Sequence, residues 1–176
     1  EAFEILTKKK NLRLIKSENI VEANWQDLKF KDVINGAVVQ ERDDLLFKDE
    51  DFKVVSKRQP SQEEIDNMIF GMKAIKNANS NGVVLVKDNA TIGYGFGEVR
   101  RSWAVEKSIE RSGDRIEGCV LASDAFFFED TVELLHANGV KAAISPGGSI
   151  HDKDVIELCD KYDMALVFTN TRHFKH

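Results

Sequence analysis

The stretch "GCVLASDAFFFEDTVELLHANGVKAAIS", residues 118–145, decides the fold. It places a short apolar segment, a segment with apolar residues at helical spacing, and a second short apolar segment in direct succession. Strands that are apolar on both faces and alternate with helices are typical of α/β layers with parallel strand pairs. The stretch therefore predicts a strand, a helix and a second strand of one buried sheet.

The same alternation extends on both sides of this stretch. Helices are predicted over "SWAVEKSIERSG" and "DKDVIELCDKY", and after Pro60, where Ser61 and Glu64 form an S-x-x-E capping box. The further predicted strands are residues 11–16, 34–41, 52–57, 82–87, 90–97 and 164–170, of which 82–97 form a hairpin around a "DN" turn. We therefore expect an α/β fold with a layered mixed sheet, and one domain over residues 1–176.

Composition narrows the class of protein. The chain has 176 residues, 42% hydrophobic and 31% charged, which fits a soluble globular domain, and its net charge of −5 disfavours nucleic acid as a partner. No segment has the length and apolarity of a membrane span. Cys119 and Cys159 have no CxxC spacing, so we expect two reduced core thiols in a cytoplasmic protein. The opening "EAFEILTKKK" resembles the tail of a helix, and we expect a piece of a longer polypeptide.

The glycine-rich stretch "ATIGYGFGEVRRSW", residues 90–103, is neither a dinucleotide fingerprint nor a P-loop. Gly93, Gly95 and Gly97 repeat with a period of two on a strand, whereas the fingerprint needs GxGxxG between a strand and a helix. Alternate glycines leave one face of a strand bare. We expect another backbone, a helix or a flat ligand to pack closely there.

Polar segments follow several of the predicted strands. Arg100 and Arg101 begin the helix after the glycines, where backbone N–H groups attract anions. Residues 123–130, 146–154 and 169–176 follow strands in the same way. The carboxyl ends of parallel strands meet at one edge, so we expect one pocket there. The alternative is that each segment is only a cap and turn.

These segments, together with "SNGVVLVKDNATIGYGFGEVRRS" and "VVSKRQPSQEE", resemble the C-terminal half of the AICAR transformylase family. This family provides the formyltransferase part of a bifunctional purine-biosynthesis enzyme whose other part is IMP cyclohydrolase. The resemblance implies a cytidine-deaminase-like subdomain without zinc, and the sequence contains neither HxE nor PCxxC. It also implies formyl transfer from 10-formyltetrahydrofolate to the 5-amino group of AICAR, with no metal.

The resemblance assigns roles to eight residues. Those implied to bind the AICAR nucleotide are Asn81, Arg101, Phe126 and Arg172, and those implied to bind folate are Ser102, Asp130, Ser149 and Ile150. Neither arginine has the sequence surroundings of a core position. The alternatives are a turn residue for Asn81, a surface charge for Arg172 and a core residue for Phe126. His173 and His176, two terminal histidines, are expected to have no partners and to be structural residues.

No catalytic residue is assigned to this chain. The family uses an adjacent lysine and histidine of its first subdomain, so we expect the isolated chain to be inactive and to need that N-terminal half as a partner, within a homodimer. The alternatives are a catalytically silent nucleotide-binding or dimerisation module, or a purely structural fragment. Departures from the family pattern leave room for them, namely Phe96, Glu98 and a proline missing from the "SDAFFF" segment.

Overall fold

The structure, a computed structural model, describes residues 2–16 and 28–175. Its contacts gather in two units, residues 1–42 and 43–176, which are described separately. The expectation of a single domain over the whole chain stays a prediction. None of the helices in the described ranges is long and apolar enough to cross a membrane.

The first unit contains a short helix, α1 (Ala2–Leu6), and an antiparallel hairpin of β1 (Lys29–Val33) and β2 (Gly36–Gln40). The predicted strand at 34–41 corresponds to β2, whereas β1 was not predicted. The strand predicted at 11–16 is wrong, because these residues are irregular and exposed. Apolar residues alone do not make a strand where no neighbouring strand pairs with them.

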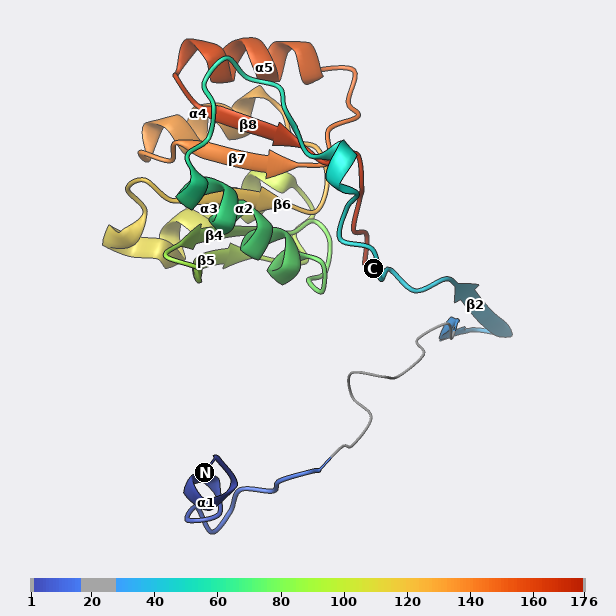
Figure 1. Ribbon diagram of the computed structural model, residues 1–176. Coiled ribbons are helices and arrows are strands. Elements are labelled where there is room, and N and C mark those ends of the chain that lie inside the picture. Colours follow the sequence, from blue (N-terminus) through green and yellow to red (C-terminus); the bar gives the residue numbers. More distant parts are fainter. Residues whose placement is uncertain (1, 17–27, 176) are drawn as a thin grey trace. The chain divides into compact units, whose positions relative to one another are not determined.

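The second unit is built on a six-stranded sheet in the order β3-β8-β7-β6-β4-β5 (Figure 1). Its strands are β3 (Lys53–Val54), β4 (Val83–Lys87), β5 (Ala90–Gly95), β6 (Val120–Ser123), β7 (Ala142–Ser145) and β8 (Ala165–Phe168). β6, β7 and β8 run parallel, and β4 is antiparallel to both β6 and β5. The predicted mixed α/β sheet is confirmed.

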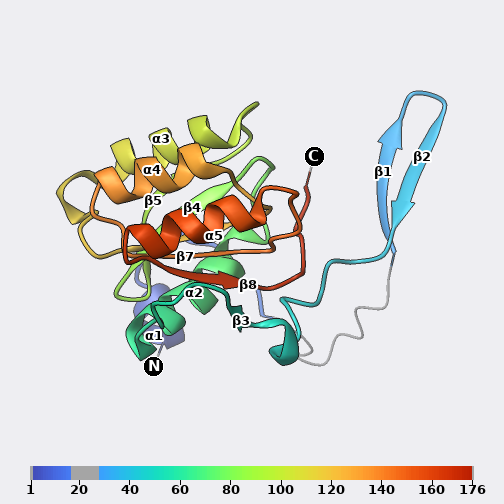
Figure 2. The ribbon, with the colours of Figure 1, turned by 90° about the horizontal axis from the view of Figure 1, so that it is seen from above.

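Helices cover both faces of this sheet, as Figure 2 shows from above. α2 lies on one face, and α3, α4 and α5 lie on the other. Their bounds are α2 (Gln62–Ile75), α3 (Arg101–Ser112), α4 (Glu129–Ala137) and α5 (Asp152–Lys161), with single 3-10 turns at Asp49–Asp51 and Gly113–Arg115. The predicted helices are therefore confirmed to within a few residues at their ends.

Alternate residues of the strands belong to two apolar cores, one on each face of the sheet. Val83 and Leu85 of β4 pack with α3, α4 and α5, whereas Val84 and Val86 pack with the methionines of α2. Because successive side chains of a strand point to opposite faces, a strand buried on both faces must be apolar throughout. Cys119 and Cys159 are free thiols buried in the first of these cores.

The start of α2 shows how local sequence fixes an element. Ser61 Oγ accepts from the Glu64 amide, and Glu64 Oε2 accepts from the Ser61 amide, which closes the predicted capping box. Arg58 donates to both carboxylate oxygens of Glu64, at 3.1 and 2.7 Å. Glu64 is thus held from the helix and from the preceding loop.

The glycines of β5 lie directly under α3. A Cβ atom at Gly93 would overlap the carbonyl oxygen of Ser108, and one at Gly95 would overlap that of Ala104. The close backbone approach expected of the bare strand face is confirmed for these two glycines, and its occupant is a helix. Gly97 has φ +69° and belongs to the following turn instead.

Two arginines donate hydrogen bonds to backbone carbonyls of β5, the last strand of the sheet. Arg111 Nη1 donates to the Tyr94 carbonyl at 2.7 Å, and Arg115 Nη2 donates to the Ile92 carbonyl at 3.1 Å. The Arg111 guanidinium also lies 4.4 Å from the centre of the Tyr94 ring. These contacts tie the end of α3 and the turn after it to the strand.

Candidate functional site

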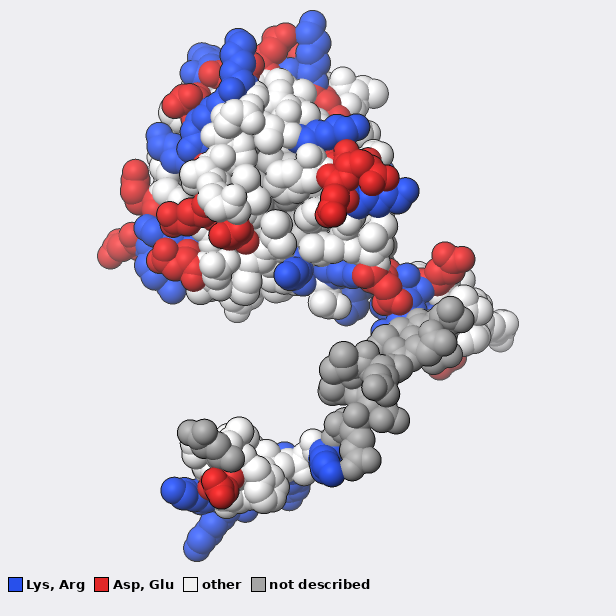
Figure 3. Space-filling view, in the orientation of Figure 1, with Lys and Arg blue, Asp and Glu red and all other residues white. Residues whose placement is uncertain are grey.

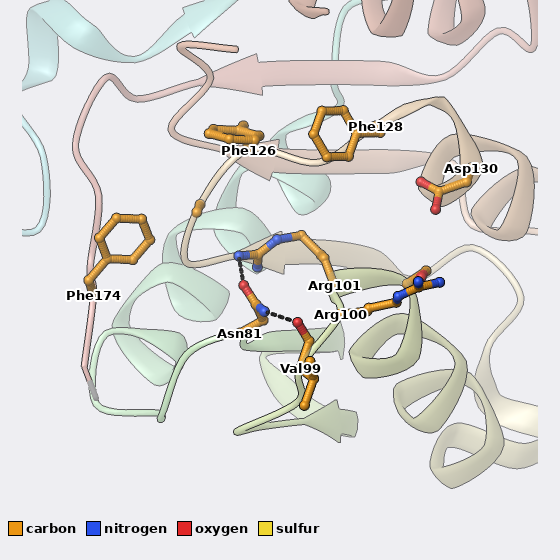
Figure 4. Close-up of a pocket in the computed structure, with 10 residues that line it drawn as sticks. Asn81, Val99, Arg100, Arg101, Phe126, Phe128, Asp130 and Phe174 are labelled. Carbon is orange, nitrogen blue, oxygen red and sulfur yellow. Dashed lines mark hydrogen bonds between the residues drawn. The ribbon is translucent and has the colours of Figure 1, made fainter.

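The loops that carry the predicted site residues meet at one edge of the sheet. β5 runs in the same direction as β6, β7 and β8, because β4 is antiparallel to both of its neighbours. The carboxyl ends of these four strands and the start of β4 therefore lie at the same edge. A pocket of about 470 Å³ opens there, and Figure 4 shows it.

Five of the eight predicted residues line this pocket. They are Asn81, Arg101, Ser102, Phe126 and Asp130. Five other residues line it without an assigned ligand role, which are Val99, Arg100, Ala125, Phe128 and Phe174, and all but Val99 belong to the segments expected at this pocket. Each of these five lies within two residues of a predicted one, so proximity in sequence was the available signal.

Arg101 is the most constrained residue of the pocket. Its Nη1 donates to Asp124 Oδ1 at 2.5 Å, to Ser123 Oγ at 2.9 Å and to the Gly82 carbonyl at 3.1 Å. The Arg101 side chain is 10% exposed and that of Asp124 is fully buried. Arg101 belongs to neither apolar core, but its guanidinium is nearly buried where the residue before β4 and the end of β6 meet.

Asn81 is fixed by the same network. Its Oδ1 accepts from Arg101 Nη2 at 2.9 Å, and its Nδ2 donates to the carbonyls of Glu98 and Val99 at 2.9 and 3.1 Å. Figure 4 shows Asn81 between Arg101 and Val99. Both N–H groups of this amide are therefore occupied, and it orients Arg101 and the 98–99 backbone.

Aromatic rings form the opposite wall. Phe126 and Phe128 pack edge to face with centroids 5.5 Å apart, and Figure 4 shows them facing Arg101 and Asn81 across the pocket. Phe127, between them in sequence, is 2% exposed and belongs to the core. Of the three consecutive phenylalanines, the outer two are thus available to a ligand and the middle one is not.

Arg172 lies beside the pocket rather than in its lining. It is exposed, donates to the Gly148 carbonyl at 3.2 Å, and has its guanidinium 5.2 Å from the centre of the Phe126 ring. One edge of its guanidinium therefore remains open to solvent. A mobile anionic group could be bound there at small desolvation cost.

The C-terminal segment is held in place by His173. This side chain is fully buried, with Nδ1 2.8 Å from Asp43 Oδ2 and Nε2 2.9 Å from the Leu46 carbonyl. The expected structural role fits this geometry, whereas the expectation that His173 has no partners is wrong. Its neighbours in sequence, Arg172 and Phe174, are thereby positioned at the pocket. His176 lies outside the described residues.

Ser149 and Ile150 are not among the residues that line the pocket. The amides of Gly148 and Ser149 donate to the two carboxylate oxygens of Asp152, at 2.7 and 3.1 Å. Ile150 is 95% exposed. The loop is linked to the pocket through Arg172, which bonds Gly148.

Two departures from the family pattern have little bearing on the pocket. Glu98 forms an ion pair with Lys107 at 2.6 Å, which compensates its charge. Phe96 packs beside Tyr94, with ring centroids 5.1 Å apart and the rings tilted, and is not among the residues that line this pocket.

Glu129, His151 and Asp154 are the described residues that could hold a metal ion. Their ligand atoms lie within 4.8 Å of one another, in the first turns of α4 and α5. His151 Nδ1 is 3.7 Å from Glu129 and 3.5 Å from Asp154, and its ring packs against Phe128. Glu129 and His151 are partly buried and Asp154 is exposed, and such exposed acidic groups are common without a metal ion.

Comparison with known proteins identifies close relatives over the whole chain. The sequence is 45% identical to the bifunctional purine biosynthesis protein PurH of Oceanobacillus iheyensis over 177 aligned residues, covering 100% of this chain and 34% of the relative. It is 46% identical to PurH of Ruminiclostridium cellulolyticum, covering 100% of this chain and 35% of that protein. The chain thus spans about a third of the length of the curated relatives it matches.

Solved structures resemble the chain only distantly. RibD of Acinetobacter baumannii aligns with 61% of this chain and 33% of its own, at a TM-score of 0.41 and 17% identity. A diaminohydroxyphosphoribosylaminopyrimidine deaminase/5-amino-6-(5-phosphoribosylamino)uracil reductase of Thermotoga maritima aligns with 59% of this chain and 34% of its own, at 0.38 and 18%. Both scores are low, and the cytidine-deaminase-like assignment stays a prediction.

A family model decides the assignment. The model described as AICARFT/IMPCHase bienzyme matches residues 1–111, which is more than half of the chain. The PurH relatives extend the similarity through the pocket residues to the end of the chain. The chain therefore belongs to the AICARFT/IMPCHase bienzyme family.

Proposed function

We propose that this chain forms nucleotide- and folate-binding walls of AICAR transformylase, as a cytidine-deaminase-like subdomain that uses no zinc. The complete enzyme transfers the formyl group of 10-formyltetrahydrofolate to the 5-amino group of AICAR. The single observation that carries the proposal is the pocket in which Asn81, Arg101 and Phe126 meet at the strand ends. Family membership supports the same assignment.

The pocket chemistry suits a flat polar base. Phe126 and Phe128 offer apolar ring faces, and Arg101 offers planar N–H donors that fit a carbonyl oxygen. Arg172 and Arg100 are the exposed cations nearby, and we assign the nucleotide phosphate to Arg172. Ser102, in the first turn of α3, and Asp130, in the first turn of α4, also line this pocket. We place the folate beside these two residues.

The reaction also needs proton transfer. The amine nitrogen of AICAR attacks the formyl carbon, the bond from that carbon to folate N10 breaks, and the proton lost by the amine is returned to N10. A positioned acid–base group must carry this proton. The chain's own pocket residues bind and orient, and we assign proton transfer to the lysine–histidine pair of an N-terminal half. The working protein is then a cytoplasmic enzyme, which we expect to be a homodimer.

A catalytically silent nucleotide-binding or dimerisation module is the alternative. The charge of Glu98 is compensated by Lys107, and Phe96 is not among the pocket-lining residues. These substitutions therefore give no physical reason for loss of ligand binding. On the face drawn in Figure 3, acidic and basic side chains are interspersed over the second unit, which supports small ligands rather than nucleic acid as partners.

Calorimetry tests the proposal. We expect the chain to bind AICAR monophosphate, and Phe126→Ala to weaken that binding by about tenfold, because the ring face is lost. Phe3→Ala, an exposed phenylalanine of α1, is the matched control and should leave binding unchanged. Absence of AICAR binding by the folded chain would contradict the proposal. Turnover by the isolated chain with both substrates would contradict the assignment of proton transfer to an N-terminal half.

Elemental analysis tests the metal. We expect no stoichiometric zinc in protein purified without added metal, because the sequence contains neither HxE nor PCxxC and the grouped side chains of Glu129, His151 and Asp154 are partly or fully exposed. Stoichiometric zinc that is lost in His151→Ala would place a metal in that cluster and contradict the zinc-free assignment.

A further inference from the structure

The charge of Arg101 is cancelled inside the protein. Asp124 Oδ1 lies 2.5 Å from Arg101 Nη1, and the Asp124 side chain is completely buried. Its second oxygen, Oδ2, is buried without a hydrogen-bond partner among the described residues. A buried carboxylate with a free lone pair acts strongly on its surroundings, because little solvent screens it.

Arg101 nevertheless keeps donors for a ligand. A guanidinium has five N–H groups. Nη1 is turned to Asp124, Ser123 and Gly82, and one Nη2–H is turned to Asn81. Within the described ranges, the Nε–H and the second Nη2–H have no acceptor. The pocket therefore offers two N–H donors on a group that is neutral overall when counted with Asp124.

Such a group discriminates between two ligands of the same shape. A carboxamide oxygen accepts both N–H bonds and adds no charge. A carboxylate accepts the same bonds, but the attraction of its charge to Arg101 is offset by the neighbouring carboxylate of Asp124. The other charged residues of the pocket lining, Arg100 and Asp130, have opposite signs, so the Arg101–Asp124 pair decides the preference.

We propose that Asp124 is a specificity-determining positioning residue, which makes Arg101 select a neutral carboxamide over the corresponding carboxylate. This inference rests on the proposed function, since it concerns the 4-carboxamide of the aminoimidazole nucleotide. Asp124 is not among the residues that line the pocket. It acts through Arg101, by fixing the guanidinium and cancelling its charge.

The test compares two nucleotides by calorimetry on the full chain. They are the 5-aminoimidazole-4-carboxamide ribonucleotide and the freshly prepared 4-carboxylate analogue. We expect the unmodified chain to bind the carboxamide at least about tenfold more tightly. Asp124→Asn retains the shape and removes the charge, so the ratio of the two dissociation constants should fall about tenfold or more. A ratio near one in the unmodified chain would overturn the inference and needs no variant.

Glu64→Gln is the matched control. It removes the acidic partner of Arg58 from another partly buried ion pair, away from the pocket-lining residues. It should lower stability without changing the ratio. An unchanged ratio in folded Asp124→Asn, or an equal change in Glu64→Gln, would also overturn the inference. Binding of neither nucleotide to the unmodified chain would instead reject the proposed function itself.

Discussion

Arg101 and Arg172 are the same residue type at the same edge of the sheet, but their surroundings differ. Arg101 is 10% exposed and has four acceptors around its two terminal nitrogens. Arg172 is exposed and has one carbonyl partner and two aromatic neighbours. Arg101 is thus part of the scaffold as well as of the pocket, whereas Arg172 is free to serve the ligand alone. Substitutions should separate the two roles.

Arg101→Ala should have the largest effect. It leaves Asp124 as an uncompensated buried charge, which costs about 3–5 kcal/mol of unfolding free energy. Urea denaturation followed by circular dichroism measures this loss. A loss below about 1 kcal/mol would mean that Asp124 is solvated in solution.

A double variant controls for the removal of bulk. Arg101→Met combined with Asp124→Leu replaces the ion pair by apolar side chains of similar size. It should recover most of the stability lost in Arg101→Ala, because neither charge is then left buried.

Gly95→Ala should have the next largest effect, of about 1–3 kcal/mol. The added methyl group overlaps the Ala104 carbonyl oxygen and forces α3, which carries Arg101, away from β5. Thermal unfolding should show the loss. Gly36→Ala is the control, because a methyl group added at Gly36 would meet no atom within 4 Å. Equal melting temperatures for both variants would contradict the close packing of α3.

Arg172→Ala should affect binding but not stability. We expect the affinity for AICAR monophosphate to fall about tenfold, which is about 1.4 kcal/mol. The unfolding free energy should change by less than about 0.5 kcal/mol, as is usual for exposed residues. Calorimetry and urea denaturation on the same preparation measure both. Unchanged affinity would show that Arg172 is only a surface charge.

The smallest effect is expected at the cysteines. Burial raises the pKa of the Cys119 and Cys159 thiols to about 12, and only the thiolate reacts with a disulfide reagent. At pH 8 the thiols of the native chain and of Arg172→Ala should therefore react equally slowly with the disulfide reagent. Those of the denatured chain should react at once. Arg101→Ala should react faster, because it opens more often. Rapid labelling of the native chain would contradict the burial of both thiols.

Much of the fold was predictable because its signals are local. β4, β6, β7 and β8 are short apolar runs, and α2 carries its capping box in four residues. The hairpin of β1 and β2 was half missed, since the strand "KFKDV" has more charged than apolar residues. Pairing with β2 decides its conformation, and pairing is not visible in either segment alone.

The site was predictable in place but not in detail. The topology of parallel strands brings the loops after them to one edge of the sheet, and the pocket lies at that edge. The burial of Arg101 depends on Asp124, 23 positions further along the chain, and on Gly82 and Ser123, which lie 19 positions before it and 22 after it. Likewise, the amide of Asn81 is occupied by carbonyls 17 and 18 positions away. Such contacts depend on the packed structure rather than on a sequence pattern.

The two arginines on the outer side of β5 have a consequence for self-association. β5 is the last strand of its sheet, and a terminal strand normally presents free carbonyls that can recruit another extended chain. Here the carbonyls of Tyr94 and Ile92 already accept from Arg111 and Arg115. An incoming strand would have to displace both guanidinium groups and tolerate their charge. Arg111 and Arg115 therefore disfavour the pairing of another strand with this sheet edge, and with it aggregation through that edge.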